Sequence, residues 1–118
     1  MEKISVADTL DAVVAQLRAG GVPADVEPAR VRVPGAWVTA TQYEHGLLGG
    51  GGTATVEIYL VVTERPGGTA WRALDSLYRK ALLAGVIPTE PTRTNEAVQL
   101  QGPQPLPAFV ITTTIENC

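Results

Sequence analysis

The 118-residue chain has one cysteine and one histidine, and this scarcity removes several classes of site. Because Cys118 is the single thiol, an intramolecular disulfide is impossible, and we interpret this last residue as a bystander. A structural zinc site needs about four ligands, and the sequence offers one histidine, His45, and one cysteine. We therefore predict that the chain has no metal site.

Clusters of basic residues and long apolar runs are also missing. The net charge is −3, and lysine and arginine do not cluster as they do on nucleic-acid-binding surfaces. No apolar run approaches the roughly 18 residues of a membrane span. The first residues lack the apolar segment of a signal peptide, which predicts synthesis in the cytoplasm. With 45% hydrophobic residues, the chain should be globular, and its length suits a single domain over 1–118.

Catalytic signals are equally sparse. The sequence contains no Gly-x-Ser-x-Gly motif, and no base or metal-ligand partner lies at a useful spacing from His45. We predict no catalytic residue, no cofactor and no enzymatic activity, so His45→Ala should leave assembly intact. The alternative, a small-molecule site, would have to be assembled from Glu44, His45, Glu57 and Tyr59.

The strongest structural signal is the alternation of residues 53–62, which is typical of a half-buried strand. One side carries Glu57 and can meet water, and we expect this strand to be central in a sheet. The other side is apolar and needs a cover: Ala54, Val56, Ile58, Leu60 and Val62.

Two amphipathic segments supply that cover as helices over about 5–19 and 70–84. Ser5 should open the first helix, and Gly20-Gly21 should end it. Thr69 should cap the second, and Gly85 should end it. The predicted stripes are Val6, Leu10, Val13, Val14 and Leu17 in the first helix, and Trp71, Leu74, Leu77, Tyr78, Ala81 and Leu82 in the second.

Further strands are predicted at 24–27, 30–33, 36–43, 97–101 and 108–116, with residues 87–95 and 102–107 as connectors. Pro34-Gly35 should form a bulge or tight turn at a sheet edge, because proline lacks an N–H group. We assign Trp37 to the core, with an interface position as the alternative.

These elements define an α+β fold of two layers, in which two helices pack on one mostly antiparallel sheet of about four to five strands. The predicted order is α-β-β-β-α-β-β. The core should include Val56, Ile58, Leu60, Leu74, Leu77 and Phe109.

Two groups of residues are candidate interfaces. Arg30 and Arg32 alternate on one side of a predicted strand, which gives either an electropositive strip or a solvated strand face. A glycine run after two leucines lacks the Gly-Lys-Ser/Thr ending of a phosphate loop, so we interpret it as a hairpin tip. It is either ordered by a partner chain or an ordinary hairpin loop: Leu47, Leu48, Gly49, Gly50, Gly51 and Gly52.

Several phrases resemble the tail terminator proteins of long-tailed phages, the family that includes minor tail protein U. The resemblance covers roughly residues 5–116, and the phrase at 33–38 is similar to forms from phages of actinobacteria. The phrases that carry it are Val-Pro-Gly-Ala-Trp-Val at 33–38, Ala-Thr-Val-Glu-Ile-Tyr-Leu-Val-Val at 54–62, Ala-Leu-Asp-Ser-Leu at 73–77 and Leu-Pro-Ala-Phe-Val-Ile at 106–111.

The resemblance implies a homo-oligomeric ring, most often a hexamer, that caps the tail tube, stops its polymerisation and joins the tail to the head. Its partners would be the major tail tube protein and a head–tail connector or neck protein. DNA would only pass through the lumen, which a non-basic chain permits. The protein would belong to the virion after assembly in the host cytoplasm. The glycine run itself predicts a hairpin that is mobile in free, monomeric subunits and becomes ordered on docking. The alternatives are another neck or tail-completion protein and a non-viral α+β interaction module.

Overall fold

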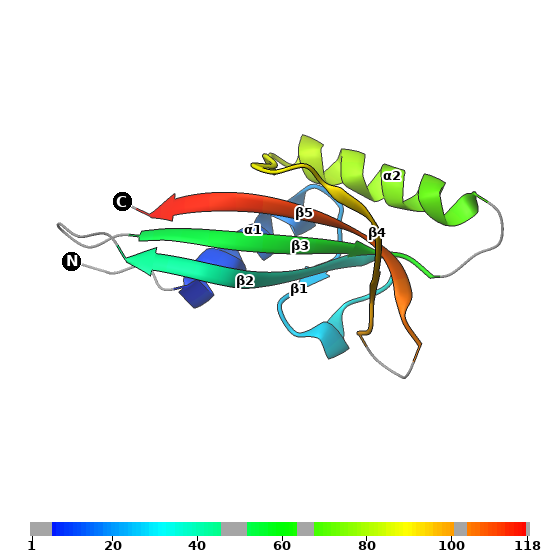
Figure 1. Ribbon diagram of the computed structural model, residues 1–118, viewed down its shortest axis with the longest axis horizontal. Helices are drawn as coiled ribbons and strands as arrows, with labels where there is room; N and C mark the ends of the chain where they lie inside the picture. The colour runs from blue at the N-terminus through cyan, green and yellow to red at the C-terminus, as the bar shows by residue number, and fades with distance from the viewer. Residues whose placement is uncertain (1–5, 46–51, 64–67, 101–103, 118) are drawn as a thin grey trace.

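A computed structural model of the chain describes residues 6–45, 52–63, 68–100 and 104–117, and in these ranges two α-helices pack on one five-stranded sheet (Figure 1). The strands lie in the order β1-β2-β3-β5-β4, and β1–β2 is the one parallel pair in the described ranges. The predicted α+β class and element order are therefore confirmed. The elements are α1 Val6–Ala19, β1 Ala24–Asp25, β2 Gly35–His45, β3 Gly52–Val61, α2 Thr69–Leu83, β4 Arg93–Val98 and β5 Leu106–Asn117.

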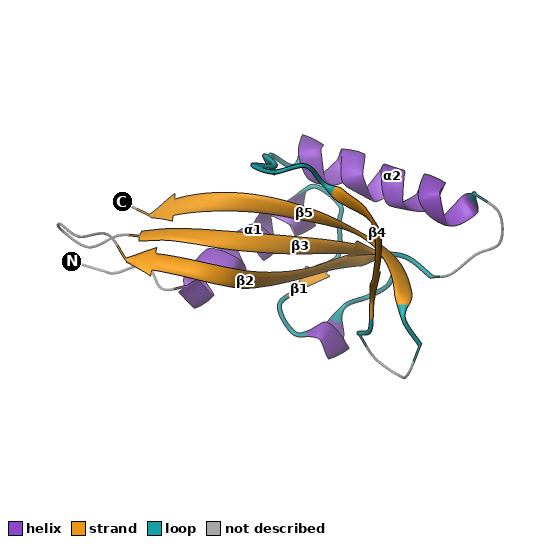
Figure 2. Ribbon diagram, viewed as in Figure 1, coloured by secondary structure: helices purple, strands orange, loops and turns teal. Residues whose placement is uncertain are grey.

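The core lies between the two helices and one face of the sheet, as the alternation of β3 predicted. Ala54, Ile58 and Leu60 are fully buried there. The helices contribute residues at helical spacing to the same cluster, so both cover the same face (Figure 2). All six residues predicted for the core are buried: Val56, Ile58, Leu60, Leu74, Leu77 and Phe109.

Both helices end at glycines, as predicted. Gly21 and Gly85 have φ values of 87° and 107°, which favour glycine, and each lies just beyond the last helical turn. The cap of α2 differs from the prediction, because Gly68 is the N-cap and no side chain caps the helix. Thr69 is instead the first helical residue. Glycine is accepted at this position at little cost, so the helix can begin one residue early.

The apolar stripe of α2 was predicted too broadly. Trp71 is 53% exposed and Leu82 is 37% exposed. The buried residues of α2 begin at Ala70 rather than at Trp71. Successive helical residues are rotated by about 100°, so Trp71 lies at the side of the helix. Trp71 still contacts Phe109 edge to face, with ring centroids 5.4 Å apart. The buried line is Ala70, Leu74, Leu77 and Ala81.

The prediction of strands at 24–27 and 30–33 was largely wrong. Only Ala24–Asp25 forms a strand, and Pro28–Arg30 forms a 3₁₀ helix. The Asp25 Oδ1 atom accepts a hydrogen bond from the Glu27 N–H at 2.9 Å, which turns the chain before a proline suited to a helix start. Val31 is buried after this turn, and the Val33–Pro34 peptide is cis.

Two further boundaries differ. β4 begins at Arg93 rather than at 97. It is an edge strand of the sheet and its first half is exposed, so this half shows no apolar alternation in the sequence. The predicted irregularity at Pro34-Gly35 is a bend before β2, whereas the bulge within β2 lies between Ala40 and Gln42.

Candidate functional site

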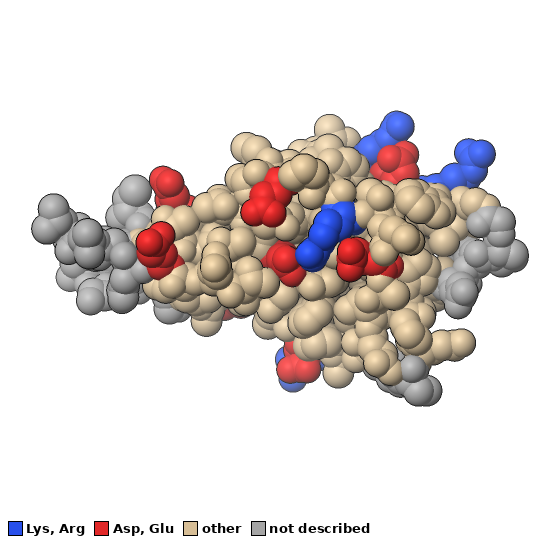
Figure 3. All heavy atoms as spheres, viewed as in Figure 1, with Lys and Arg blue, Asp and Glu red and all other residues tan. Residues whose placement is uncertain are grey.

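The face of the sheet that carries no helix is built largely of polar residues, and we call it the open face. Cross-strand partners arrange it in rows across β2, β3 and β5. Threonine and glutamate dominate these rows, and Figure 3 shows acidic side chains scattered over this side of the molecule. The rows are Trp37–Tyr59–Val110, Thr39–Glu57–Thr112, Gln42–Thr55–Thr114 and Glu44–Thr53–Glu116.

The two ends of the open face differ. Near β4, which crosses in front of the sheet in Figure 1, Val61 and Val110 are fully buried. At the other end Thr53 is half-buried, and Thr114 and Glu116 are exposed. Only the second end therefore presents a polar surface to other molecules.

Trp37 lies on the open face and not in the core, which corrects the prediction. Its ring contacts the Tyr59 ring at a centroid distance of 4.9 Å, and its Nε1–H donates to the Val26 carbonyl oxygen at 3.0 Å. Side chains alternate between the two faces of the sheet along β2, so Trp37 lies on the other face from its neighbours Ala36 and Val38, which belong to the core. It remains half-buried because aromatic and loop neighbours cover it.

A polar cluster joins β3 to β4 beside this tryptophan. The Tyr59 hydroxyl donates to Glu57 Oε1 at 2.9 Å, and Arg93 Nη2 donates to Glu57 Oε2 at 3.2 Å. Burial raises the pKa of Tyr59, and the hydrogen bond to the Glu57 carboxylate raises it further. Both carboxylate oxygens are thus engaged, so this cluster anchors β4 and leaves no free base. Sequence reasoning missed Arg93 because β4 was expected to begin after it.

The alternative small-molecule site is assembled only in part. Glu57 and Tyr59 do meet, but Glu44 is paired with Thr53, four residues along β3 from Glu57. At the usual rise of a strand this separation is roughly 13 Å. His45 pairs with Gly52 through its backbone, and its side chain lies outside the described part of the structure.

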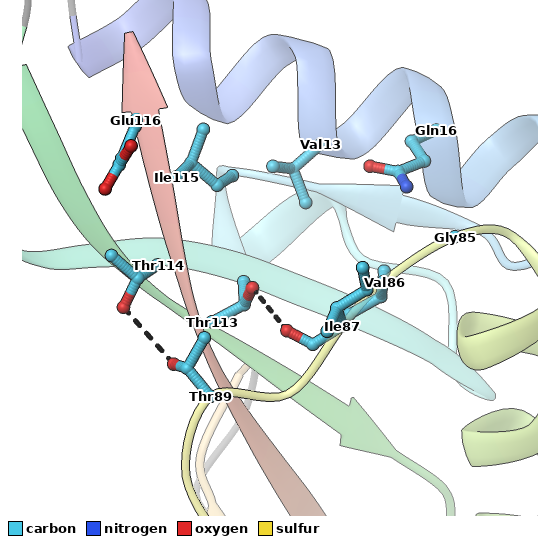
Figure 4. A pocket seen from close by; sticks show the side chains of 10 residues that line it. All are labelled: Val13, Gln16, Gly85, Val86, Ile87, Thr89, Thr113, Thr114, Ile115 and Glu116. Atoms are coloured by element: carbon cyan, nitrogen blue, oxygen red, sulfur yellow. Dashed lines mark hydrogen bonds between the residues drawn. The ribbon is translucent and has the colours of Figure 1, made fainter.

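A groove of about 380 Å³ runs between α1, β5 and the connector that follows α2 (Figure 4). Its hydroxyl groups already have partners: Thr113 Oγ1 donates to the Ile87 carbonyl oxygen at 2.7 Å. The Thr89 and Thr114 hydroxyls lie 3.2 Å apart. These bonds fasten the connector to β5, and the groove is best explained as the junction between packed elements of the fold. It is lined by Val13, Gln16, Gly85, Val86, Ile87, Thr89, Thr113, Thr114, Ile115 and Glu116.

Arg30 and Arg32 are both exposed but stand on the 3₁₀ helix and the loop after it, rather than on a strand. They line one hollow together with Arg18 and Asp25. In that hollow Arg18 Nη2 and Asp25 Oδ2 lie 3.5 Å apart. The arginines therefore share one side of the molecule, although the predicted strand that was to align them is absent.

Most of the predicted hairpin tip, Leu47, Leu48, Gly49, Gly50 and Gly51, lies outside the described residues. Gly52 belongs to β3 and pairs with His45, so it is part of the strand rather than of the tip. A Cβ atom at Gly52 would come within 2.6 Å of the Tyr43 hydroxyl and of the Glu44 carbonyl oxygen. This close approach accounts for glycine at that position.

The sheet has unpaired edges at the polar end. β1 pairs only with Ala36 and Trp37, so beyond Trp37 the side of β2 that faces away from β3 pairs with no strand in the described ranges. β4 pairs with β5 only as far as Val110, and beyond it Thr89 bonds to Thr112. Beyond Val110, the side of β5 that faces away from β3 pairs with no strand in those ranges, and the connector contacts Thr113 and Thr114 there instead. Sequence patterns could not reveal these edges, because they depend on where β1 and β4 end.

No model of a known protein family matches the chain, and neither does any curated protein sequence. In the part of the chain that the structure describes, no helix is long and apolar enough to cross a membrane. Nor do three histidine, cysteine, aspartate or glutamate side chains gather there in a way that could hold a metal ion.

Proposed function

We propose that the protein is a non-enzymatic, ring-forming structural protein of a phage tail, acting as the terminator that caps the tail tube. One observation carries the proposal: both helices cover one face of the sheet, and the other face is polar, rich in threonine and acidic. A subunit with this division suits a ring in which the helices lie outside and the open face lines the lumen.

The charges of the open face fit a passage for DNA. Glu44, Glu57 and Glu116 lie on it, and the guanidinium of Arg93 is engaged with Glu57. Free basic groups on a lumen wall would bind the phosphate backbone and retain the DNA. An acidic and neutral wall lets the DNA slide past, which is what a tail ring requires.

The partners follow from the same proposal. The ring would contact the major tail tube protein on one side and a head–tail connector on the other, as part of the virion. Leu47 and Leu48 come shortly after the end of β2 in the sequence and would contact the tube or a neighbouring subunit. Arg30 and Arg32 would form a second contact.

Deletion of the coding sequence from the phage genome tests this function. The expected result is a lysate with tails of uncontrolled length, restored to normal length by supplying the protein from a plasmid. Infectious particles with normal tails after deletion would overturn the proposal. They would favour an interaction module instead, for which the exposed Leu83 and Ile87 on and after α2 are the supporting observation.

A charge variant tests the lumen separately. Thr53→Lys combined with Thr55→Lys adds two cations to the open face, and it should give tails of normal length with reduced DNA delivery. The matched control is Thr53→Gln with Thr55→Gln, which adds length without charge and should behave as wild type. Equal infectivity of the two variants would show that this face does not line the DNA passage.

A further inference from the structure

A hollow of about 380 Å³ at the end of α1 gathers more cations than anions, and we call it the arginine hollow. Three arginines line it, one from α1, one from the 3₁₀ helix and one from the loop that follows: Arg18, Arg30 and Arg32. Asp25 is the one carboxylate among the described residues that line it. The hollow therefore keeps an excess of positive charge, although the net charge of the whole chain is −3.

The carboxylate of Asp25 is already fully engaged. Its Oδ1 atom accepts a backbone N–H of the turn that follows, and its Oδ2 atom lies 3.5 Å from Arg18 Nη2. Arg18 Nε also donates to the Ala24 carbonyl oxygen at 3.0 Å, which holds this guanidinium at the wall of the hollow. The guanidinium groups of Arg30 and Arg32 form no ion pair with the residues that the structure describes. Both can therefore take anionic groups from outside.

Local packing fixes where the two exposed arginines lie. Val31, which stands between them in the sequence, is 2% exposed and anchors the loop to the body of the protein. The Ala36 N–H donates to the Pro23 carbonyl oxygen at 2.8 Å. A Cβ atom at Gly35 would collide with the carbonyl oxygens of Arg32 and Pro23. Glycine at this position thus lets the loop lie close against the residues after α1, which brings Arg32 to the hollow.

The opposite end of α1 carries the complementary charge. Asp8 and Asp11 lie one turn apart on its exposed side, so their carboxylates are neighbours. Ala12 and Ala15 are exposed on the same side, and their short side chains allow another surface to come close. Within one chain the two aspartates lie roughly 15 Å and 10 Å along the helix from Arg18. They are therefore too far away to fill the hollow of their own subunit.

We propose that the arginine hollow of one subunit receives the Asp8 and Asp11 carboxylates of a second copy of this chain. Two carboxylates balance the excess charge of the hollow, and arginine binds carboxylates through paired N–H donors. The two surfaces lie at opposite ends of α1, so copies meet head to tail. Such a contact closes into a ring when the rotation permits. The inference rests on the proposed ring and assigns its interface.

The contact agrees with a lumen that does not retain DNA. Asp8, Asp11 and Arg18 belong to α1, which covers the other face of the sheet from the open face. Arginines paired with carboxylates of the next subunit would also be unavailable to the phosphates of DNA. The open face would thus stay acidic and neutral in the assembled ring.

Charge reversal in the hollow tests the contact. Arg30→Glu with Arg32→Glu, the hollow variant, should need at least about tenfold more protein than wild type to assemble in sedimentation velocity. Added salt should weaken assembly of the wild type, because it screens exposed charges. The matched control is Arg72→Glu with Lys80→Glu, which changes the net charge equally at exposed positions of α2. The control should assemble as the wild type does.

A mixing experiment tests whether the two surfaces bind each other. Asp8→Lys with Asp11→Lys should be as defective alone as the hollow variant. An equal mixture of the two should assemble near the wild-type concentration, because each subunit then meets a neighbour of opposite charge at both ends. Circular dichroism checks that each variant is folded, and Asp11→Lys alone replaces the double variant if the change at Asp8 unfolds the start of α1. A mixture of folded variants that stays monomeric would overturn the proposal.

The outcomes separate this inference from the proposed function. A wild-type protein that stays monomeric at every concentration overturns the contact and the ring together. A hollow variant that assembles as the wild type does overturns the contact and leaves the ring standing. If that variant then fails to cap tail tubes, the arginines bind an acidic surface of the tube protein instead of a second copy.

Discussion

The two faces of β3 show how one strand serves two purposes. Ile58 and Leu60 point into the core and are fully buried, whereas their neighbours Glu57 and Tyr59 point to the open face and form a polar cluster. The covered face depends on apolar burial for stability. The open face contributes less to stability and is available for contact with other molecules. Substitutions on the two faces should therefore separate folding from assembly.

The largest effect is expected on the covered face. Ile58→Ala leaves a cavity beneath the helices and should lower the free energy of unfolding by about 2–5 kcal/mol. Thr55→Ala, on the other face of the same strand, should cost less than about 1 kcal/mol. Chemical denaturation of the two variants measures the difference. A loss below about half a kcal/mol for Ile58→Ala would show that this face does not hold the fold together.

A smaller effect is expected at the cluster that anchors β4. Glu57→Gln weakens the bonds from Tyr59 and Arg93 and should cost about 1 kcal/mol, because Arg93 is 48% exposed and solvent screens its charge. The control is Asp75→Asn, which breaks the exposed ion pair with Arg79 on α2. The control should change stability by less than about 0.5 kcal/mol. Equal losses in the two variants would show that the open-face cluster is no more than a surface pair.

The raised pKa of Tyr59 predicts a pH dependence of stability. Burial and the Glu57 carboxylate hold this hydroxyl neutral in the folded state, whereas an unfolded tyrosine ionises near 10.0. The stabilisation is therefore complete below pH 10.0 and is lost as pH rises through the folded-state pKa. Tyr59→Phe should be less stable at neutral pH and should lose less stability between neutral and strongly alkaline pH than wild type. Parallel curves for the two proteins would contradict this account.

The smallest effect is expected at the exposed end of α2. Leu83 is 87% exposed, so Leu83→Ser should change the free energy of unfolding by less than about 0.5 kcal/mol. Leu77→Ser, on the buried line of the same helix, is the contrasting variant and should be strongly destabilised. A large loss for Leu83→Ser would indicate that this residue is covered by a neighbouring subunit.

The sequence predicted the covered face well because the apolar period follows directly from burial. The alternation of 53–62 and the stripes of both helices identified Val56, Ile58, Leu74 and Leu77 as core residues. Trp71 was misplaced because an aromatic residue at the border of a stripe looks apolar in either position.

The open face could be predicted only in part. The sequence placed Glu57 on the exposed side and named Tyr59 with it as a possible polar site, but the bond from Arg93 to Glu57 joins residues 36 positions apart. Arg30 and Arg32 were misassigned to a strand because the sequence alternates there between arginine and valine. The structure instead turns at Asp25 and forms a 3₁₀ helix from Pro28. The unpaired edges depend on the lengths of β1 and β4, which no local pattern specifies.

The mass of the assembled protein tests the central claim most directly. Native mass spectrometry of the wild-type chain over rising concentration should show monomer giving way to one closed species. With the six-fold symmetry that the resemblance to tail terminators implies, that species has six times the 12.4 kDa mass of the chain, and no larger series follows it. A protein that remains monomeric throughout, or one that stops at a dimer, would contradict the account.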